Sequence, residues 1–152
     1  MLKRARVIRG MVCVFSPRMS RPATYRDLDT WKFAMDLVEQ CYRASASFPQ
    51  EERYGLTSQL RRAAVSIPSN VAEGYCRRTT KVYANHVSIA LGSHGELETC
   101  IELGSRLGFM SSTDRTGLQD QCDVVGRLLS GLYRSLEEKI NRDAARRPPS
   151  NG

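Results

Sequence analysis

The sequence predicts an all-α protein, an antiparallel up-down-up-down four-helix bundle. Four successive segments carry apolar residues every three or four positions, as one face of an α-helix does. No segment alternates apolar and polar residues in the manner of a β-strand. Short breaks separate the four segments, and short loops favour antiparallel neighbours. A chain of 152 residues is long enough to bury one such core.

The folded domain is expected at residues 25–145, between a disordered basic N-terminal tail at 1–24 and a disordered C-terminal tail at 146–152. Residues 1–24 hold six Lys or Arg and no acid, whereas residues 25–140 hold 14 basic and 15 acidic residues. The net charge of +7 therefore lies mostly in the tails. The N-terminal tail could bind polyanions, or it could be a solvated terminus or an extension upstream of a later start at Met11 or Met19.

The first helix is expected at residues 26–47, ended by Phe48 and Pro49, because a residue before proline avoids the α region. Its expected core stripe is Leu28, Trp31, Met35, Val38 and Tyr42, widened by Ala34 and Cys41. The second helix is expected at residues 51–74, with a kink or a break at Pro68, which removes one backbone hydrogen bond.

The third helix is expected from Thr79 or Thr80 to Leu107, and the fourth from residues 112–114 to Ala145. The third carries two apolar stripes on separate faces. One stripe is Tyr83, Val87, Ala90, His94, Leu97 and Ile101, and the other is Ile89, Ser93, Glu96, Cys100, Leu103 and Leu107. Since a bundle helix needs one such stripe, the second is expected to meet another subunit. The alternative is that it packs a neighbouring helix of the same bundle.

A polar stripe runs beside the apolar stripe of the second helix. Its members are Gln59, Arg62, Ser66, Asn70 and Glu73. They are short or planar hydrogen-bonding side chains, which suit a partly buried network or interface that also includes Ser93 and Glu96. Arg62 is expected to pair with Glu73 or Glu96. The alternative is an ordinary solvated face.

The five cysteines are expected to be free thiols in a cytoplasmic protein, three of them at core positions of helices. A disulfide framework or a zinc site is the alternative. The N-terminal apolar patch is too short for an export signal.

No catalytic motif is found, so the sequence predicts a protein that is not an enzyme and takes no cofactor or metal. The two histidines, His86 and His94, are eight residues apart, too far for a metal pair on one helix face. His94 lies on an apolar stripe, which favours a core residue.

Residues 56–74, with the sequence LTSQLRRAAVSIPSNVAEG, resemble the signature of the bacterial four-helix-bundle proteins encoded in intervening sequences of 23S rRNA genes. Residues 28–35 (LDTWKFAM), 48–52 (FPQEE) and 89–98 (IALGSHGELE) fit the same family. The resemblance covers about residues 25–110.

The resemblance implies a four-helix bundle that forms a homopentamer. It also implies kinship with the accessory variability protein of diversity-generating retroelements, a basic pentamer that binds nucleic acid and a reverse transcriptase. This chain departs from that relative in its nearly neutral body. The candidate nucleic-acid contacts in the body are Arg61, Arg77, Arg78 and Lys81, for which the alternative is a solvated helix end.

These observations favour a non-enzymatic homo-oligomer that acts as a scaffold or binding module, with RNA, DNA or a nucleic-acid-processing protein as its partner and no membrane role. The alternative is a structural module for protein–protein assembly without a nucleic-acid role.

Overall fold

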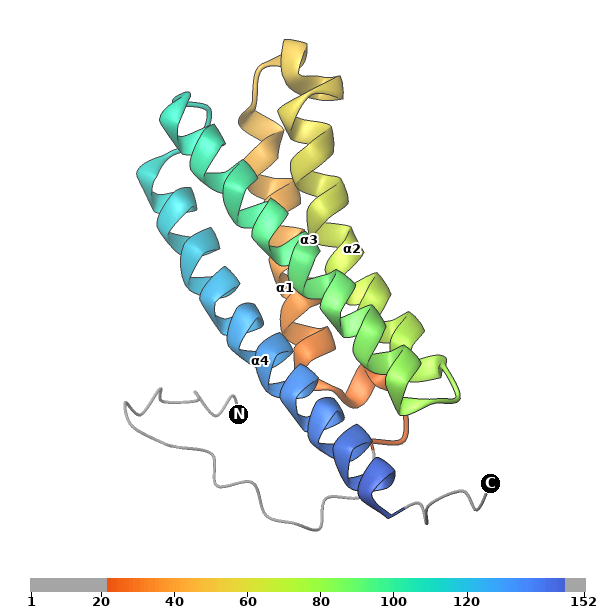
Figure 1. The fold of residues 1–152 in the computed structure, drawn as a ribbon. Coiled ribbons are helices and arrows are strands. Elements are labelled where there is room, and N and C mark those ends of the chain that lie inside the picture. Colours follow the sequence, from red (N-terminus) through yellow and green to blue (C-terminus); the bar gives the residue numbers. More distant parts are fainter. Residues whose placement is uncertain (1–21, 147–152) are drawn as a thin grey trace, which may run out of the picture.

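The computed structural model describes residues 22–146, which form four α-helices. They are α1 (Asp29–Ala44), α2 (Leu56–Cys76), α3 (Thr80–Arg106) and α4 (Ser112–Ala145). No strand occurs between residues 22 and 146, so the all-α four-helix fold is confirmed. The helices lie side by side, and the chain reverses its direction from each helix to the next (Figure 1).

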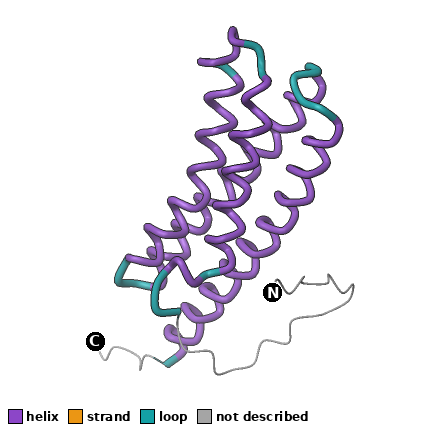
Figure 2. Tube along the Cα trace, turned by 180° about the vertical axis from the view of Figure 1, so that it is seen from behind, coloured by secondary structure: helices purple, strands orange, loops and turns teal. Residues whose placement is uncertain are grey.

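Three 3-10 helices lie at the ends of the bundle: η1 (Tyr25–Asp27), η2 (Ser45–Ser47) and η3 (Gln50–Tyr54). Loops are confined to the two ends as well (Figure 2). The tails expected at 1–24 and 146–152 fall mostly on residues 1–21 and 147–152, which lie outside the described residues. Pro22 already belongs to the folded part, because its carbonyl accepts a hydrogen bond from the hydroxyl of Tyr75.

The boundaries expected for the last two helices are confirmed, and polar caps explain them. The Oγ1 of Thr79 accepts the backbone N–H of Val82 at 3.2 Å, at the start of α3. Past the end of α3 lies Gly108, whose φ of 71° is accessible mainly to glycine. The Oγ of Ser111 accepts the N–H of Asp114 at 3.0 Å, at the start of α4.

The second helix differs from expectation at its start. Residues 50–54 form the separate helix η3, and α2 begins only after Gly55. The Glu52 carboxylate accepts the backbone N–H of Leu56 at 2.8 Å, which satisfies a free donor at the new helix start. The helix then continues through the buried Pro68 without the break that was one expectation, and the kink at this residue stays a prediction.

The apolar stripe expected for the first helix is confirmed in part. Ala34 and Cys41 are buried, and Leu28, Trp31 and Val38 are partly buried against the core. The buried residues of α1 are Thr30, Ala34, Leu37, Cys41 and Ala44. Met35 and Tyr42, expected in the core, are 36% and 45% exposed, whereas Leu37 is fully buried. Because α1 carries apolar residues on nearly every side, its periodicity fits two registers. The observed one turns small side chains inward, which lets α1 lie close to its neighbours.

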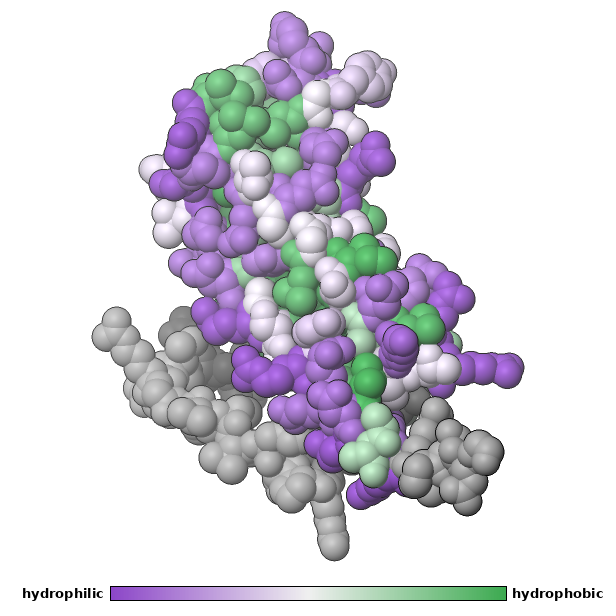
Figure 3. Space-filling model, viewed as in Figure 1, coloured by the Kyte–Doolittle hydropathy of each residue, from purple (hydrophilic) through white to green (hydrophobic). Residues whose placement is uncertain are grey.

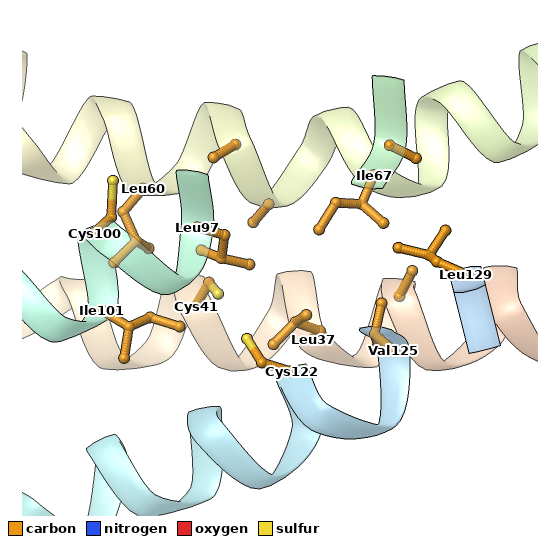
Figure 4. Packing of buried hydrophobic residues seen from close by; sticks show 14 of the residues in the cluster. Leu37, Cys41, Leu60, Ile67, Leu97, Cys100, Ile101, Cys122, Val125 and Leu129 are labelled. Atoms are coloured by element: carbon orange, nitrogen blue, oxygen red, sulfur yellow. The ribbon is translucent and has the colours of Figure 1, made fainter. Parts of the chain in front are cut away.

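The core is formed by side chains from all four helices. Figure 4 shows Leu37, Leu60, Leu97 and Leu129, one from each helix, pointing into the same space. The first stripe expected for the third helix is buried throughout, so that face of α3 is confirmed as the core face.

Candidate functional site

A seam of polar side chains joins α2 and α3 along the outside of the bundle. Near its middle the hydroxyls of Ser66 and Ser93 share a hydrogen bond of 2.8 Å. The Asn70 amide donates to the Ser66 hydroxyl at 3.1 Å and to the Ser66 carbonyl at 2.9 Å. Towards the other end, the Gln59 amide donates to the Glu96 carboxylate. The structure thus brings together five of the residues expected in a polar network.

The seam contains one residue that sequence reasoning missed. The Nδ1 of His86 lies 3.2 Å from the Oδ1 of Asn70, and its Nε2 lies 3.9 Å from the Glu73 carboxylate. Since an amide oxygen only accepts, Nδ1 carries the proton in this contact. The spacing offered a signal, because His86 lies seven residues before Ser93 and therefore on the same helix face.

Arg62 does not pair as expected. The Glu73 carboxylate is taken by Arg77, and that of Glu96 by Gln59. Among residues 22–146, no carboxylate forms an ion pair with Arg62. The expected ion pair is wrong because Arg62 lies farther round α2 than the rest of the seam. Arg62 instead lines a cavity on the outer side of that helix.

An exposed apolar row follows α3 beside the seam. Its members are Val82 (41% exposed), Ile89 (47%), Leu103 (45%) and Leu107 (52%). The second stripe expected on this helix is thus open to solvent within one chain, apart from the buried Cys100 and the half-buried Ser93. Figure 3 shows separate hydrophobic patches on the face that α3 presents. Neighbouring helices of the same chain therefore do not cover this row.

The four candidate nucleic-acid contacts fall into two places. Arg77, Arg78 and Lys81 are exposed at the turn between α2 and α3, where Arg77 is paired with Glu73. Arg61 lies 16 residues before Arg77 on α2, about 24 Å away along the helix axis. It donates to the Ser45 hydroxyl at 2.8 Å instead. The expected cluster is therefore not one site.

The described cysteines are free thiols, as expected: Cys41, Cys76, Cys100 and Cys122. Cys13 lies outside the described residues. Burial raises the pKa of Cys41 to about 12 and the pKa of Cys122 to about 12, and it also raises the pKa of Cys100. These three thiols are protonated at neutral pH and are poor nucleophiles.

His94 is a core residue with a partner, as its position on the apolar stripe predicts. Its Nε2 donates to the carbonyl of Cys122 at 2.8 Å, so the ring ties α3 to α4. Its Nδ1 lies 3.5 Å from the Glu98 carboxylate. The ring also rests against Gly126, where an added Cβ would lie 3.0 Å from the His94 Cε1.

Two further observations bear on function. In the part of the chain that the structure describes, no three His, Cys, Asp or Glu side chains are grouped so as to hold a metal ion. None of the helices between residues 22 and 146 combines the length and hydropathy of a membrane span.

A comparison with family models matches residues 26–131 to the family described as 23S rRNA-intervening sequence protein. A similar solved structure is that of a protein of unknown function from the S23 ribosomal protein family of Bacteroides thetaiotaomicron. It is 17% identical, with a TM-score of 0.64, over 69% of this chain and 95% of that one, a likeness of fold. A search of curated proteins finds no match.

Proposed function

Because the chain belongs to the 23S rRNA-intervening sequence protein family, we propose that it is a non-enzymatic scaffold in the cytoplasm that assembles with copies of itself and binds nucleic acid or a nucleic-acid-processing protein. The assembly uses the outer face of α3. The copy number is five, as the family resemblance implies. Free thiols in the core support a reducing compartment.

The observation that carries the assembly is the exposed apolar row on α3. Val82, Ile89 and Leu103 fall on positions that are multiples of seven residues apart, so they follow one face of the helix. Each is more than two-fifths exposed in the single chain. Covering side chains of this size stabilises an interface by about 25 cal/mol per Å² of apolar surface removed from water. The adjacent polar seam supplies hydrogen-bonding groups for the rim of that interface.

Gly92, on the same helix as the exposed apolar row, also supports an interface with another copy. An added Cβ at Gly92 meets no atom within 4 Å, so nothing inside the chain requires glycine there. Glycine in a helix interior costs about 1 kcal/mol relative to alanine. A close approach by a helix of another copy accounts for that cost.

The assembly is tested by light scattering of the purified full-length chain. We expect an oligomer for the wild type, and a smaller particle for Ile89→Asp and for Leu103→Asp, because a carboxylate in an apolar interface is costly. Phe33→Asp on α1, 39% exposed in the wild type, is the matched control and should leave the particle mass unchanged. Circular dichroism checks that each variant stays helical. A monomeric wild type contradicts the assembly.

The nucleic-acid part rests on the basic residues of the turn between α2 and α3 and of the N-terminal segment. Arg78 and Lys81 form no ion pair with any carboxylate of residues 22–146. We expect the full chain to bind RNA or DNA at physiological salt, and binding to persist in part without residues 1–21. Binding lost entirely with residues 1–21 would indicate a non-specific tail effect.

The alternative is a structural module for protein–protein assembly without a nucleic-acid role. The near balance of 14 basic and 15 acidic residues over 25–140 favours it. No binding of the full chain to either nucleic acid at physiological salt, together with an intact oligomer, would select this alternative.

A further inference from the structure

A cavity of about 650 Å³ opens on the outer side of the bundle, where the end of α1, the helix η3 and the first half of α2 meet. Tyr42 of α1, Arg53 and Tyr54 of η3, and Arg61 and Arg62 of α2 line it. In Figure 1 this place is the end of the bundle at which α1 leads into α2. Its volume lies in the range of pockets that hold small organic ligands.

The lining is positively charged, with three guanidinium groups and no carboxylate. Between residues 22 and 146, neither Arg53 nor Arg62 forms an ion pair, and Arg61 contacts only the Ser45 hydroxyl and the ring of Tyr42, 4.6 Å from the ring centroid. Of the ten other arginines among residues 22–146, five pair with glutamates: Arg43, Arg77, Arg106, Arg115 and Arg142. The other five form no ion pair: Arg26, Arg78, Arg127, Arg134 and Arg146. The cavity is distinguished because three arginines without an ion pair line it together.

The two glutamates of η3 do not neutralise the positive charge of the cavity. Glu51 and Glu52 belong to η3, but neither lines the cavity. The Glu52 carboxylate is engaged with the backbone N–H of Leu56 at 2.8 Å. The cavity thus favours an anionic ligand.

The aromatic rings of the cavity favour a ligand that also carries a flat ring for stacking. Tyr54 is 88% exposed and Tyr42 is 45% exposed, so both offer ring surface to solvent. The guanidinium of Arg53 lies 5.6 Å from the Tyr54 centroid. Rings interleaved with arginines are typical of sites where unpaired bases stack and phosphates are neutralised.

We infer that this cavity binds single-stranded nucleic acid, with a base stacked on Tyr54 and backbone phosphates at Arg53, Arg61 and Arg62. The inference rests on the nucleic-acid part of the proposed function and names its site. A single strand fits better than a duplex, because a duplex hides the faces of its bases between neighbouring pairs. The site is separate from Arg77 and Arg78, which lie at the other end of α2.

The test measures fluorescence anisotropy of a labelled oligothymidylate with the full-length protein at several salt concentrations. Stacking of one base is worth about 1–3 kcal/mol, so we expect Tyr54→Ala to weaken binding by about 5- to 150-fold and Tyr54→Phe, which keeps the ring, to restore it. Because the Tyr54 side chain is 88% exposed, we expect its removal to leave the fold unchanged.

The contacts between arginines and phosphates are tested separately, by the salt dependence of binding. Arg53→Ala should lower the slope of log K against log salt concentration by about 0.7, the loss of one phosphate contact to a single strand. Arg106→Ala is the matched control. It removes the same charge from an exposed arginine outside the cavity, and should leave the slope unchanged.

Three results would overturn the inference: wild-type affinity in Tyr54→Ala and Arg53→Ala, equal affinity for a duplex of the same length, or equal competition by polyglutamate. In the first case, binding that persists through Arg78 or the N-terminal segment would leave the proposed function standing. Light scattering of each variant separates a loss of the site from a change in assembly.

Discussion

At the scale of single residues, Gly74 is explained by the packing of the neighbouring helix and not by the helix propensity of glycine. The second helix was expected to end at residue 74, but it runs on to Cys76 and Gly74 is buried inside it. An added Cβ would lie 2.7 Å from the His86 Cβ and 2.7 Å from the Tyr83 Cδ2. Glycine is therefore required because α3 approaches the α2 backbone here.

We expect Gly74→Ala to lower the free energy of unfolding by about 1–3 kcal/mol, since the new methyl group overlaps atoms that cannot move freely. This loss outweighs the gain in helix propensity of about 1 kcal/mol. Gly131→Ala is the control, because its Cβ would meet no atom within 4 Å, and it should stabilise the protein. Urea unfolding followed by circular dichroism at one protein concentration measures both. Equal shifts for the two variants would contradict this account.

At the scale of the elements, the contact between α2 and α3 combines an apolar core side with a polar seam. The seam residues are only half-buried near its middle, at Ser66, Asn70 and Ser93, and exposed at its ends. Each half-buried polar group has a partner, so the seam restricts how the two helices can slide past each other.

Asn70 is the central member of the seam, with bonds to Ser66 on its own helix and to His86 on α3. Asn70→Ala should lower the free energy of unfolding by about 1–3 kcal/mol, because it leaves half-buried groups without partners. Ser69→Ala is the neighbouring control, since the Ser69 hydroxyl bonds only to its own helix at Val65. It should change the same free energy by less than about 0.5 kcal/mol. Denaturant unfolding compares the two. Equal effects would show that the seam adds no stability.

At the scale of the whole molecule, buried thiols from three helices are expected to make the free energy of unfolding fall as the pH rises into the alkaline range. The pKa of Cys41 and that of Cys122 are each raised by burial from 9.0 to about 12. Above the ordinary pKa the unfolded chain releases protons that the folded chain keeps. Their contribution to stability is therefore complete below that pKa and declines as the pH rises towards 12.

We expect the free energy of unfolding to fall by about 1.4 kcal/mol per pH unit for each such thiol in this window. Cys41→Ala should reduce the slope of the free energy of unfolding against pH by the contribution of one thiol. This holds whatever the effect of the substitution on stability at neutral pH. Cys76→Ala removes an exposed thiol and should leave the slope unchanged. Urea unfolding at a series of alkaline pH values measures the slopes. A slope that is the same in Cys41→Ala and the wild type would rule out the buried thiol as its source.

Much of the candidate site could be predicted from the sequence, and the rest depended on juxtaposition. The spacing of Gln59, Ser66 and Asn70 indicated a shared face and a network, which the structure places against α3. Spacing along one helix does not say which residues of another helix lie opposite, so Arg62 was given a partner that it does not meet. The cavity escaped prediction because its tyrosines and arginines come from three separate segments.

The sequence by itself determined the fold class, the four helices, the bounds of the last two and the family. These follow from periodicity, capping residues and a long motif, which act over a few neighbouring residues. Only the tertiary structure decided which face of α1 is buried, why Gly74 is glycine, and that Tyr54 and Arg62 meet at one cavity. Such features depend on side-chain packing between segments far apart in the chain, and local patterns carry no information about that packing.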